Sequence, residues 1–437
     1  MPDDRLTAAE LREIWAILSP AERVESFEHT DRSEVHSFFL SLSGQEQAAL
    51  LLAMRSGERR LWMRLLAPDD AADVIQLVPP EDRAPFLEML DEPTRREVTA
   101  LMAYAEDAAG GLMSPRFARL RPDMKVGEAI RYLQRQAQEK LETIYYAYVL
   151  DQEQRLLGVV SFRDLFVAPG DRPVSDVMRR DVVSVPDTLD QEAVAHVIAR
   201  HDLNALPVVD AGGRMKGIVT VDDIVDVVQQ AATEDIQKLG GMEALDTPYM
   251  QTSMLAMVKK RAGWLSALFL GEMLTASAMG HYEEEIARAV VLALFVPLII
   301  SSGGNSGSQA TTLIIRAMAL GEVTIKDWWR IVRRELTAGL SLGVILATIG
   351  LVRILVWQAV FHTYGEHYLE VAATVAISLV GIVTWGTLAG SMLPFAIRRL
   401  GFDPASASAP FVATLVDVSG LIIYFNVAQI VLQGTLL

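Results

Sequence analysis

A single charged residue lies in the last apolar stretch of the sequence. Asp417 is the only charged residue from Pro410 to Leu432. An ionised Asp at the centre of a membrane helix costs about 2.5–3.5 kcal/mol on insertion scales, so such residues usually face a cavity and serve transport. Asp417 lies seven residues beyond Pro410, or about 10 Å along a helix. We predict that it binds a cation in a pore; a protonated, structural Asp is the alternative.

A second polar pattern interrupts the apolar residues 287–319. Gly303 and Gly304 stand among polar side chains that recur every three or four residues. At membrane depth this pattern indicates either close helix packing or a wet path. It is not a phosphate loop, because no Lys follows the glycines and no strand precedes them. The polar stripe consists of Ser301, Asn305, Ser308 and Thr312.

Acidic residues are concentrated in residues 222–246, a connector with seven Asp and Glu and a single Lys. Asp223 and Asp226 are three residues apart, so a helix would place them on one face. Hard divalent cations are bound through carboxylate oxygens and water. The connector is therefore a candidate cation sensor, with a solvated acidic surface as the alternative.

A further helix is predicted between this connector and the first long apolar run. Thr247 is a typical N-cap, and Pro248 is typical of the first helical position. The helix is expected to end at Lys259-Lys260-Arg261, where the basic residues indicate the edge of a membrane.

The composition explains how such different patterns share one chain. The 437 residues are 51% hydrophobic yet 22% charged, and this length indicates several domains. The net charge is −16, of which the first 261 residues carry −14. The acidic balance argues against a nucleic-acid partner, which needs a basic face. The absence of Cys excludes a disulfide scaffold, a thiolate zinc site and a Cys nucleophile.

Five apolar segments in the second part of the chain are long enough to cross a lipid bilayer. Basic residues flank them on alternate sides, at 259–261, 326–334 and 398–399. The positive-inside rule places the first 261 residues in the cytoplasm and the C-terminus outside. The first residues lack the apolar core of a secretory signal, which fits a cytoplasmic first part. From the five spans we expect a multi-pass protein of the cell (inner) membrane. The spans are about 264–280, 287–319, 337–361, 371–397 and 410–432.

Residues 1–110 have the periodicity of short helices. Apolar residues recur at three- and four-residue spacing, and a start signal of Pro with acidic residues repeats about every dozen residues. This repeat predicts a small helical solenoid. The acidic residues of the start signals are interpreted as first-turn charges, with a surface for a partner or a cation as the alternative. They are Asp69, Asp70, Glu81, Asp82, Asp91 and Glu92.

A repeated mixed unit follows the helices. Residues 151–165 align with residues 210–224 at an offset of 59 without a gap, and Asp, Arg, Gly, Val and Asp recur in place. Each unit reads as helix, strand, turn, strand and helix. The pair resembles a tandem cystathionine-β-synthase (CBS) domain pair, with repeats over 111–171 and 172–231.

CBS pairs often bind adenosine nucleotides in the cleft between the repeats. The resemblance implies Arg163 and Asp164 as the matching positions for ATP. Leu203 stands where an aromatic could stack on the adenine, so a nucleotide is the weaker of the expected ligands.

The order of helical solenoid, CBS pair, acidic connector and five spans resembles that of the MgtE family of magnesium transporters. The matching strings are ATEDIQKLG from Ala232, GGNSGSQ from Gly303, Asp403-Pro-Ala, and ATLVDVSGLIIY from Ala413. The resemblance implies a multi-domain fold. Its parts are an all-α N-terminal superhelical domain over 1–110, an α/β tandem CBS pair over 111–231, an acidic connector and plug helix over 232–261, and a polytopic α-helical membrane domain over 262–437.

The same resemblance implies a homodimeric magnesium channel or transporter, and not an enzyme, with the pore between the subunits. Asp417 would bind Mg²⁺ with its waters, together with the Ala413 carbonyl and Asn305, and Asp403 would lie at the pore mouth. Ala231 stands where the family can carry another acid, which weakens one sensor site. The cytosolic Mg²⁺ sensor that closes the pore would comprise Asp190, Glu192, Asp202, Asp223, Asp226, Glu234 and Asp235.

Single features of the sequence argue against two other functions. An intramembrane metalloprotease needs a His-Glu-x-x-His helix, which is absent, and Asp417 would repel the ions of an anion channel. A CBS-regulated transporter of Co²⁺, Mn²⁺ or Ni²⁺, and a membrane sensor that transports nothing, are the alternatives. Glu272, in the first span, has no assigned role.

Overall fold

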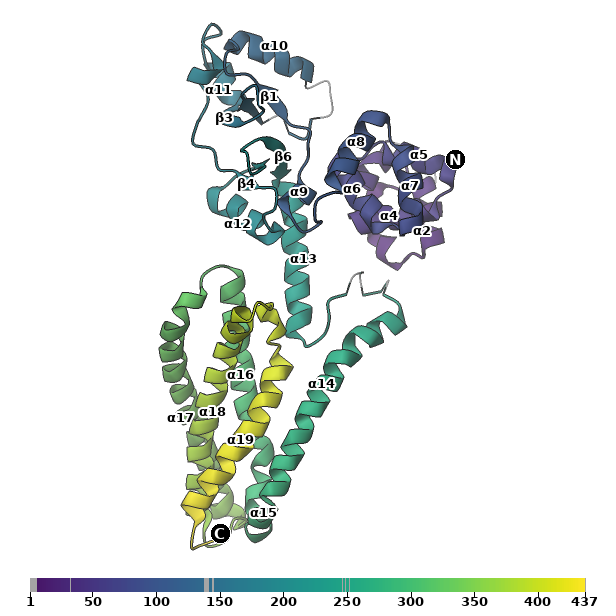
Figure 1. Ribbon diagram of the computed structural model, residues 1–437. Helices are drawn as coiled ribbons and strands as arrows, with labels where there is room; N and C mark the ends of the chain where they lie inside the picture. The colour runs from purple at the N-terminus through teal and green to yellow at the C-terminus, as the bar shows by residue number, and fades with distance from the viewer. Residues whose placement is uncertain are drawn as a thin grey trace. The chain divides into compact units, whose positions relative to one another are not determined.

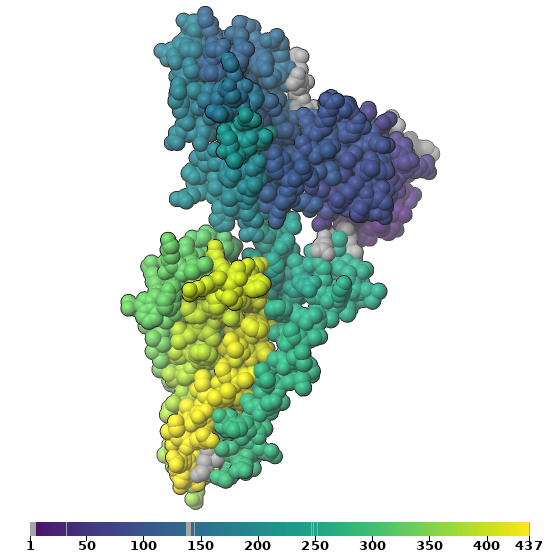
Figure 2. All heavy atoms as spheres, in the orientation of Figure 1, coloured from purple at the N-terminus to yellow at the C-terminus, as the bar shows by residue number. Residues whose placement is uncertain are grey.

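The computed structural model describes residues 6–31, 33–136, 141–143, 145–245, 247, 249–250 and 252–436. The chain divides into two compact units, Met1–Ala231 and Ala232–Leu437. Short helices and small sheets form the first unit, and long helices that lie side by side form the second (Figure 1). Figure 2 shows the heavy atoms of the same chain in the same colours. Helix α13, Val221–Leu239, begins in the first unit and ends in the second.

The first unit opens with a stack of short helices, whose starts are stabilised by their own sequence. Ser19 and Ser43 accept hydrogen bonds from the third residue of the helix, and Glu22 and Glu46 bond back to the cap. Pro occupies the first turn of three later helices. The predicted helical domain is confirmed. Its helices are α1 Ala8–Ile14, η1 Trp15–Ile17, α2 Pro20–Glu28, α3 Val35–Leu40, α4 Gly44–Ala53, α5 Ser56–Met63, α6 Pro68–Leu77, α7 Pro80–Met89 and α8 Glu92–Leu101.

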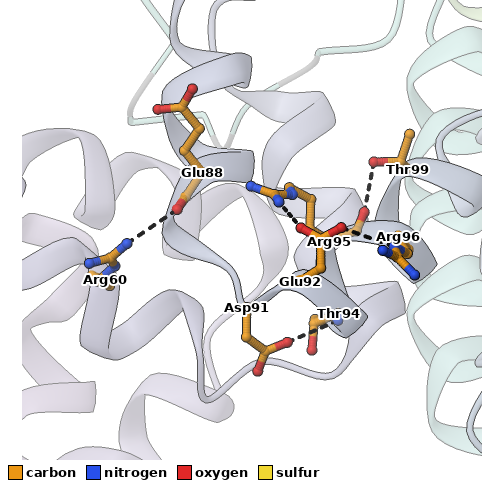
Figure 3. A network of polar contacts seen from close by, with 8 residues as sticks. All are labelled: Arg60, Glu88, Asp91, Glu92, Thr94, Arg95, Arg96 and Thr99. Carbon is orange, nitrogen blue, oxygen red and sulfur yellow. Dashed lines mark hydrogen bonds and ion pairs between the residues drawn. The ribbon is translucent and has the colours of Figure 1, made fainter.

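The start of α8 shows how its acidic residues are used (Figure 3). Asp91 Oδ1 accepts a hydrogen bond from the Thr94 backbone N–H at 2.9 Å, and this bonding lowers the pKa of Asp91. Glu92 pairs with Arg95 and, at 3.0 Å, with Arg96. The interpretation of these two acids as charges of a helix start is confirmed.

Each CBS repeat forms one three-stranded sheet, in the orders β1-β2-β3 and β4-β5-β6. In both sheets the first pair of strands is parallel and the second pair is antiparallel. Tyr146 pairs with Ser161, and Ala205 pairs with Thr220, so the offset of 59 in the sequence is also the offset in strand register. The elements are α9 Ala109–Leu112, β1 Ala118–Leu120, α10 Val126–Gln136, β2 Tyr146–Leu150, β3 Leu156–Ser161, α11 Phe162–Val167, η2 Val174–Asp176, β4 Val185–Pro186, α12 Gln191–His201, β5 Ala205–Val209 and β6 Met215–Thr220.

Long helices dominate the second unit. Within the described residues, Ile325–Phe361, Tyr368–Arg399 and Ala409–Leu432 are long and apolar enough to cross a membrane. Two further helices, α14 and α16, have the length of a span but carry more polar residues. The elements are α14 Met254–His281, α15 Glu283–Arg288, η3 Val290–Leu294, α16 Val296–Ala319, η4 Ile325–Asp327, α17 Trp328–Phe361, α18 Tyr368–Arg399, η5 Pro404–Ser406 and α19 Ala409–Leu432.

The helix expected from Thr247 begins later than predicted. Thr247 lies in a bend, and Pro248 and Asp246 fall outside the described residues. Helix α14 starts at Met254, where the Ser253 side chain accepts a hydrogen bond from the Ala256 N–H. The helix then continues through the basic residues to His281, so the expected plug helix and the first span form one helix.

The second span also differs from its prediction, because residues 287–319 do not form one helix. Helix α15 ends at Arg288, a 3₁₀ turn follows, and α16 starts at Val296. Pro297 lies in the first turn of α16, where its missing N–H costs nothing, whereas inside a helix it would break a hydrogen bond.

Candidate functional site

Helices α16 and α18 approach each other closely because each has two glycines four residues apart. A Cβ atom on Gly386 would collide with the carbonyl of Gly303, and one on Gly390 with the carbonyl of Gly307. Small residues at this spacing let helix backbones approach in a membrane. Thr311 Oγ1 also bonds the Gly307 carbonyl at 2.9 Å and the Gly390 carbonyl at 2.8 Å. The glycines of the polar pattern therefore serve helix packing.

The predicted polar stripe lies on a different face of α16. Ser301, Asn305 and Thr312 are exposed within the single chain, and Asn305 Nδ2 donates to Ser301 Oγ at 3.2 Å. Ser308 Oγ donates to the carbonyl of Ala409, at the start of α19, at 3.1 Å. The glycines thus fit the interpretation as close helix packing, and the stripe lies on a face that is open within the single chain.

Asp417 lies on α19 against this open side of α16. A Cβ atom on Gly304 would be 3.4 Å from Asp417 Oδ1 and 3.4 Å from the Ala413 Cβ. Asp417 is half-buried, and Asn305 follows Gly304 directly. The structure therefore brings Asp417, Ala413 and the stripe of Asn305 together at one place between α16 and α19.

A second polar group joins the end of α13 to the turn before α19. Lys238 Nζ lies 2.8 Å from Asp403 Oδ2 and 3.4 Å from Glu234 Oε2. Burial raises the pKa of Asp235, and the neighbouring Asp403 charge raises it further. Three predicted ligands, Glu234, Asp235 and Asp403, thus lie near one another, and a lysine ammonium holds two of them.

The first unit contains a set of carboxylates that face one another across a domain boundary, the acidic interface. Burial, together with the charges of nearby acids, raises the pKa of Asp73 and of Asp223 to about 7. Asp69 is 6% exposed, and its Oδ1 has no hydrogen-bond partner among the described residues. The members come from α6, the segment before β2 and α13: Asp69, Asp70, Asp73, Glu142, Asp222, Asp223 and Asp226.

The remaining predicted ligands lie at the two ends of α12. Asp190 caps its start, with Oδ1 accepting the Glu192 N–H at 2.9 Å. Asp202 follows its end in a left-handed conformation with φ of 50°. An 11-residue helix separates the ends by about 16 Å, so one chain does not bring Asp202 together with Asp190 and Glu192.

The carboxylates are grouped without forming a finished cation cage. Among the residues that the structure describes, no three His, Asp or Glu side chains converge closely enough to hold a metal ion. The acidic interface consists instead of like charges, several of them poorly solvated, which a divalent cation could bring closer together.

Comparisons with known proteins cover most of the chain. Residues 296–427 match a family described as a divalent cation transporter, MgtE, residues 6–107 match the MgtE intracellular N domain, and residues 109–171 and 174–230 match the CBS domain. The magnesium transporter MgtE of Thermus thermophilus is 42% identical over 428 residues, which cover 97% of this chain and 93% of that protein. The chain belongs to the MgtE family of divalent cation transporters.

Two further MgtE proteins are similar to this chain. The magnesium transporter MgtE of Enterococcus faecalis is 36% identical over 77% of this chain and 72% of its own length. The crystal structure of the cytosolic domain of the Mg²⁺ channel MgtE in complex with ATP is 41% identical. It covers 52% of this chain and 92% of that chain, with a TM-score of 0.47. The MgtE family is a transporter family and not a class of enzymes.

Sequence reasoning missed part of the acidic interface in this MgtE chain. Asp69 and Asp70 do lie in the first turn of α6, but they also face the acids of α13. Asp73 and Glu142 were not among the predicted ligands. The available signal was the spacing of Asp69, Asp70 and Asp73, which places three acids on one side of a helix without a base.

The predicted nucleotide positions lie at the start of α11. Arg163 is exposed, and Asp164 lies 3.8 Å from Arg179. Leu203 packs against the hydrophobic core of the first unit. ATP binding at these positions stays a prediction.

The acidic interface predicts a pH dependence of stability in the absence of divalent cations. The pKa values of Asp73 and Asp223, about 7 against an ordinary 3.8, mean that the folded chain holds more protons than the unfolded chain from about pH 4 to 7. Stability should therefore fall as the pH rises through this window. We expect the first unit to unfold about 3–6 °C lower at about pH 7.5 than at about pH 5.5, as measured by calorimetry of the full chain in nanodiscs with chelator.

The paired variant Asp73→Asn with Asp223→Asn is the control for this pH effect. It should lose most of the pH dependence, because the amides do not titrate. Added Mg²⁺ should also remove most of it, since a cation stabilises the ionised carboxylates. An unfolding temperature of the wild type that does not change between the two pH values would contradict the burial of these acids.

Proposed function

We propose that this chain is a Mg²⁺-selective import channel of the cell membrane whose opening is controlled by cytosolic Mg²⁺. Five spans, α14 and α16 to α19, would place the first unit in the cytoplasm and the C-terminus outside. Two copies would form the pore between them, lined by α16 and α19. The observation that carries the proposal is the carboxylate of Asp417, which lies at membrane depth against the open polar side of α16.

The chemistry of this place suits a hydrated cation. Mg²⁺ gives up its waters reluctantly and usually keeps several of them when bound. A half-buried carboxylate beside exposed amide and hydroxyl groups can bind such an ion through its waters, and the Ala413 carbonyl can add a further acceptor. Selectivity would then follow from pore width and from oxygen atoms spaced for the hydrated ion.

Control by Mg²⁺ is supported by the acidic interface. Its carboxylates repel when ionised, so a cation that binds between them favours the arrangement in which α6 and α13 lie close. A ligand that prefers one arrangement shifts the equilibrium toward it. High cytosolic Mg²⁺ would hold the closed arrangement, and low Mg²⁺ would let the domains separate and the pore open. Asp190, Glu192 and Asp202 would contribute through a partner subunit.

The proposal is tested by flux into proteoliposomes that contain the full chain and an internal Mg²⁺-sensitive dye. We expect Mg²⁺ uptake above that of protein-free liposomes. Excess Co²⁺, Mn²⁺ or Ni²⁺ tests the alternative of a broader divalent transporter. If these ions enter at the same rate as Mg²⁺, the chain is not selective for Mg²⁺. A chain that moves none of these ions would favour the membrane sensor that transports nothing.

The control by cytosolic Mg²⁺ makes a separate prediction for the connector. In nanodiscs, trypsin should cut the full chain at residues 232–261 more slowly in ~10 mM Mg²⁺ than in the presence of a chelator. This Mg²⁺ concentration is chosen because carboxylate sites of this kind bind the ion weakly. Asp223→Asn should reduce this protection several-fold, because it removes a central carboxylate. The matched change Asp181→Asn, at an exposed acid outside the acidic interface, should leave it intact. Equal cleavage with and without Mg²⁺ would contradict the sensor.

ATP is a second ligand that the CBS pair could bind, with Arg163 and Asp164 as the contacting positions. The structure of the relative is described as a complex with ATP, which motivates the test. Calorimetric titration of the full chain with ATP should show binding that Arg163→Ala weakens, and the absence of heat at millimolar ATP would reject it.

A further inference from the structure

Glu272 is an acidic residue at membrane depth that has no role in the ion pathway described above. It lies in the second half of α14, the 28-residue helix Met254–His281, and its side chain is exposed within the single chain. No Lys or Arg follows it in α14. Acidic residues at this depth usually face a bundle interior or a water-filled path, because contact of the charge with lipid is costly.

The inner contact between α14 and α19 places Glu272 level with Asp417. Trp264 Nε1 donates to Ser408 Oγ at 3.2 Å, at the residue that caps α19. Counted from this contact, Glu272 lies eight residues along α14 and Asp417 nine residues beyond Ser408. At 1.5 Å per residue these are about 12 and about 14 Å.

An outer contact gives the same register. Tyr282 stacks on Phe425 with ring centroids 4.7 Å apart, and its hydroxyl accepts a hydrogen bond from Asn426 Nδ2 at 3.1 Å. Counted inward from this level, Glu272 is ten residues from Tyr282, and Asp417 is nine from Asn426. Contacts at both ends of the helix pair therefore place the two carboxylates at one depth.

The contacts between these ends bring the two acids close to each other. A Cβ atom on Gly271 would lie 2.9 Å from Thr414 Cγ2, and Thr414 is one helical turn before Asp417. Glu272 follows Gly271 directly in the sequence, next to this contact. One turn beyond Glu272, Thr275 is only 7% exposed, and its hydroxyl has no hydrogen-bond partner within the described part of the chain.

We propose that Glu272 is a second cation-binding carboxylate of the ion pathway, which holds a hydrated divalent cation together with Asp417. This inference rests on the proposed function. Two carboxylates without a nearby base repel each other, and a dication between them removes this repulsion, whereas a monovalent ion leaves one charge unbalanced. Because Mg²⁺ keeps its waters, both carboxylates can bind it through water without touching it.

The test is Glu272→Gln, which keeps the shape of the side chain and removes its charge. In proteoliposomes at low ionic strength, the Mg²⁺ concentration for half-maximal uptake should rise roughly five- to tenfold, while the flux at saturation changes less than about twofold. Block by cobalt(III) hexaammine, an exchange-inert mimic of hydrated Mg²⁺, should weaken by a similar factor. Glu272→Asp, which keeps the charge, should fall between the wild type and the Gln variant.

Glu322→Gln is the matched control, because it makes the same change at an exposed acid after α16. Its half-saturation should equal that of the wild type. A purely structural role of Glu272 would lower thermal stability or maximal flux in the Gln variant and leave half-saturation and block unchanged, and that result would overturn the inference. If the wild type itself takes up no Mg²⁺, the proposed function is rejected. Failure of the inference about Glu272 can therefore be distinguished from failure of the proposed function.

Discussion

Replacement of Asp417 by Asn is expected to reduce Mg²⁺ uptake about 100-fold or more. The change keeps the size of the side chain and removes one carboxylate from each subunit of the proposed pore. A dication about 5 Å from a carboxylate, at an effective dielectric constant of about 20, is attracted by about 7 kcal/mol. Loss of less than half of this energy, about 2.8 kcal/mol, suffices for a 100-fold effect. The initial rate of dye-reported uptake in proteoliposomes measures it.

Two further variants define what this result means. Asp417→Glu keeps the charge but extends the side chain, and it should retain a measurable part of the flux. Glu366→Gln changes an exposed acid in the segment between α17 and α18, and it should transport like the wild type. If Asp417→Asn carries Mg²⁺ as fast as the wild type, then Asp417 does not bind the permeating ion.

The repeat of the CBS pair could be predicted from the sequence because its signals are local. Two segments of the same pattern at an offset of 59 predict the same unit twice, and Tyr146 and Ala205 indeed occupy equivalent places in the two sheets. The long helices were predictable in the same way, because a run of about 20 apolar residues is a property of one segment.

The acidic interface could not be predicted in full because it depends on contacts between distant segments. Asp73 and Asp223 are 150 residues apart in the sequence, yet the charge of Asp223 adds to the effect of burial in raising the pKa of Asp73. Spacing shows that acids share one face of α6 or one face of α13. It does not show that the two faces meet, since this depends on how the N-terminal helices pack against the second CBS repeat.

The position of Glu272 illustrates the same limit within the membrane helices. Its number in the sequence gives a depth, but the neighbour at that depth depends on the register between α14 and α19. Trp264 and Tyr282 set that register through their contacts with Ser408 and Asn426. Such side chains look ordinary in a span, because aromatic residues are common near the ends of membrane helices.

The contact between α16 and α18 makes the second large prediction, for Gly390→Ala. The added methyl group would collide with the Gly307 carbonyl and lie 2.8 Å from Thr311 Oγ1, and backbone atoms cannot move without shifting the whole helix. Both hydrogen bonds of Thr311 would be strained with it. We expect a loss of about 2–3 kcal/mol in the free energy of unfolding, measured by thermal unfolding in nanodiscs.

The matched control is Gly263→Ala, which adds the same methyl group inside α14. Among the described residues, no atom outside the adjoining backbone of α14 lies within 4 Å of it. It should be neutral or slightly stabilising, because Ala favours a helix over Gly by about 1 kcal/mol. Because the packed glycines place Gly304 against Asp417, Gly390→Ala should also impair Mg²⁺ uptake in whatever protein folds. Equal stability of the two variants would mean that α16 and α18 do not approach through their glycines, and that the polar stripe of Asn305 is positioned by other contacts.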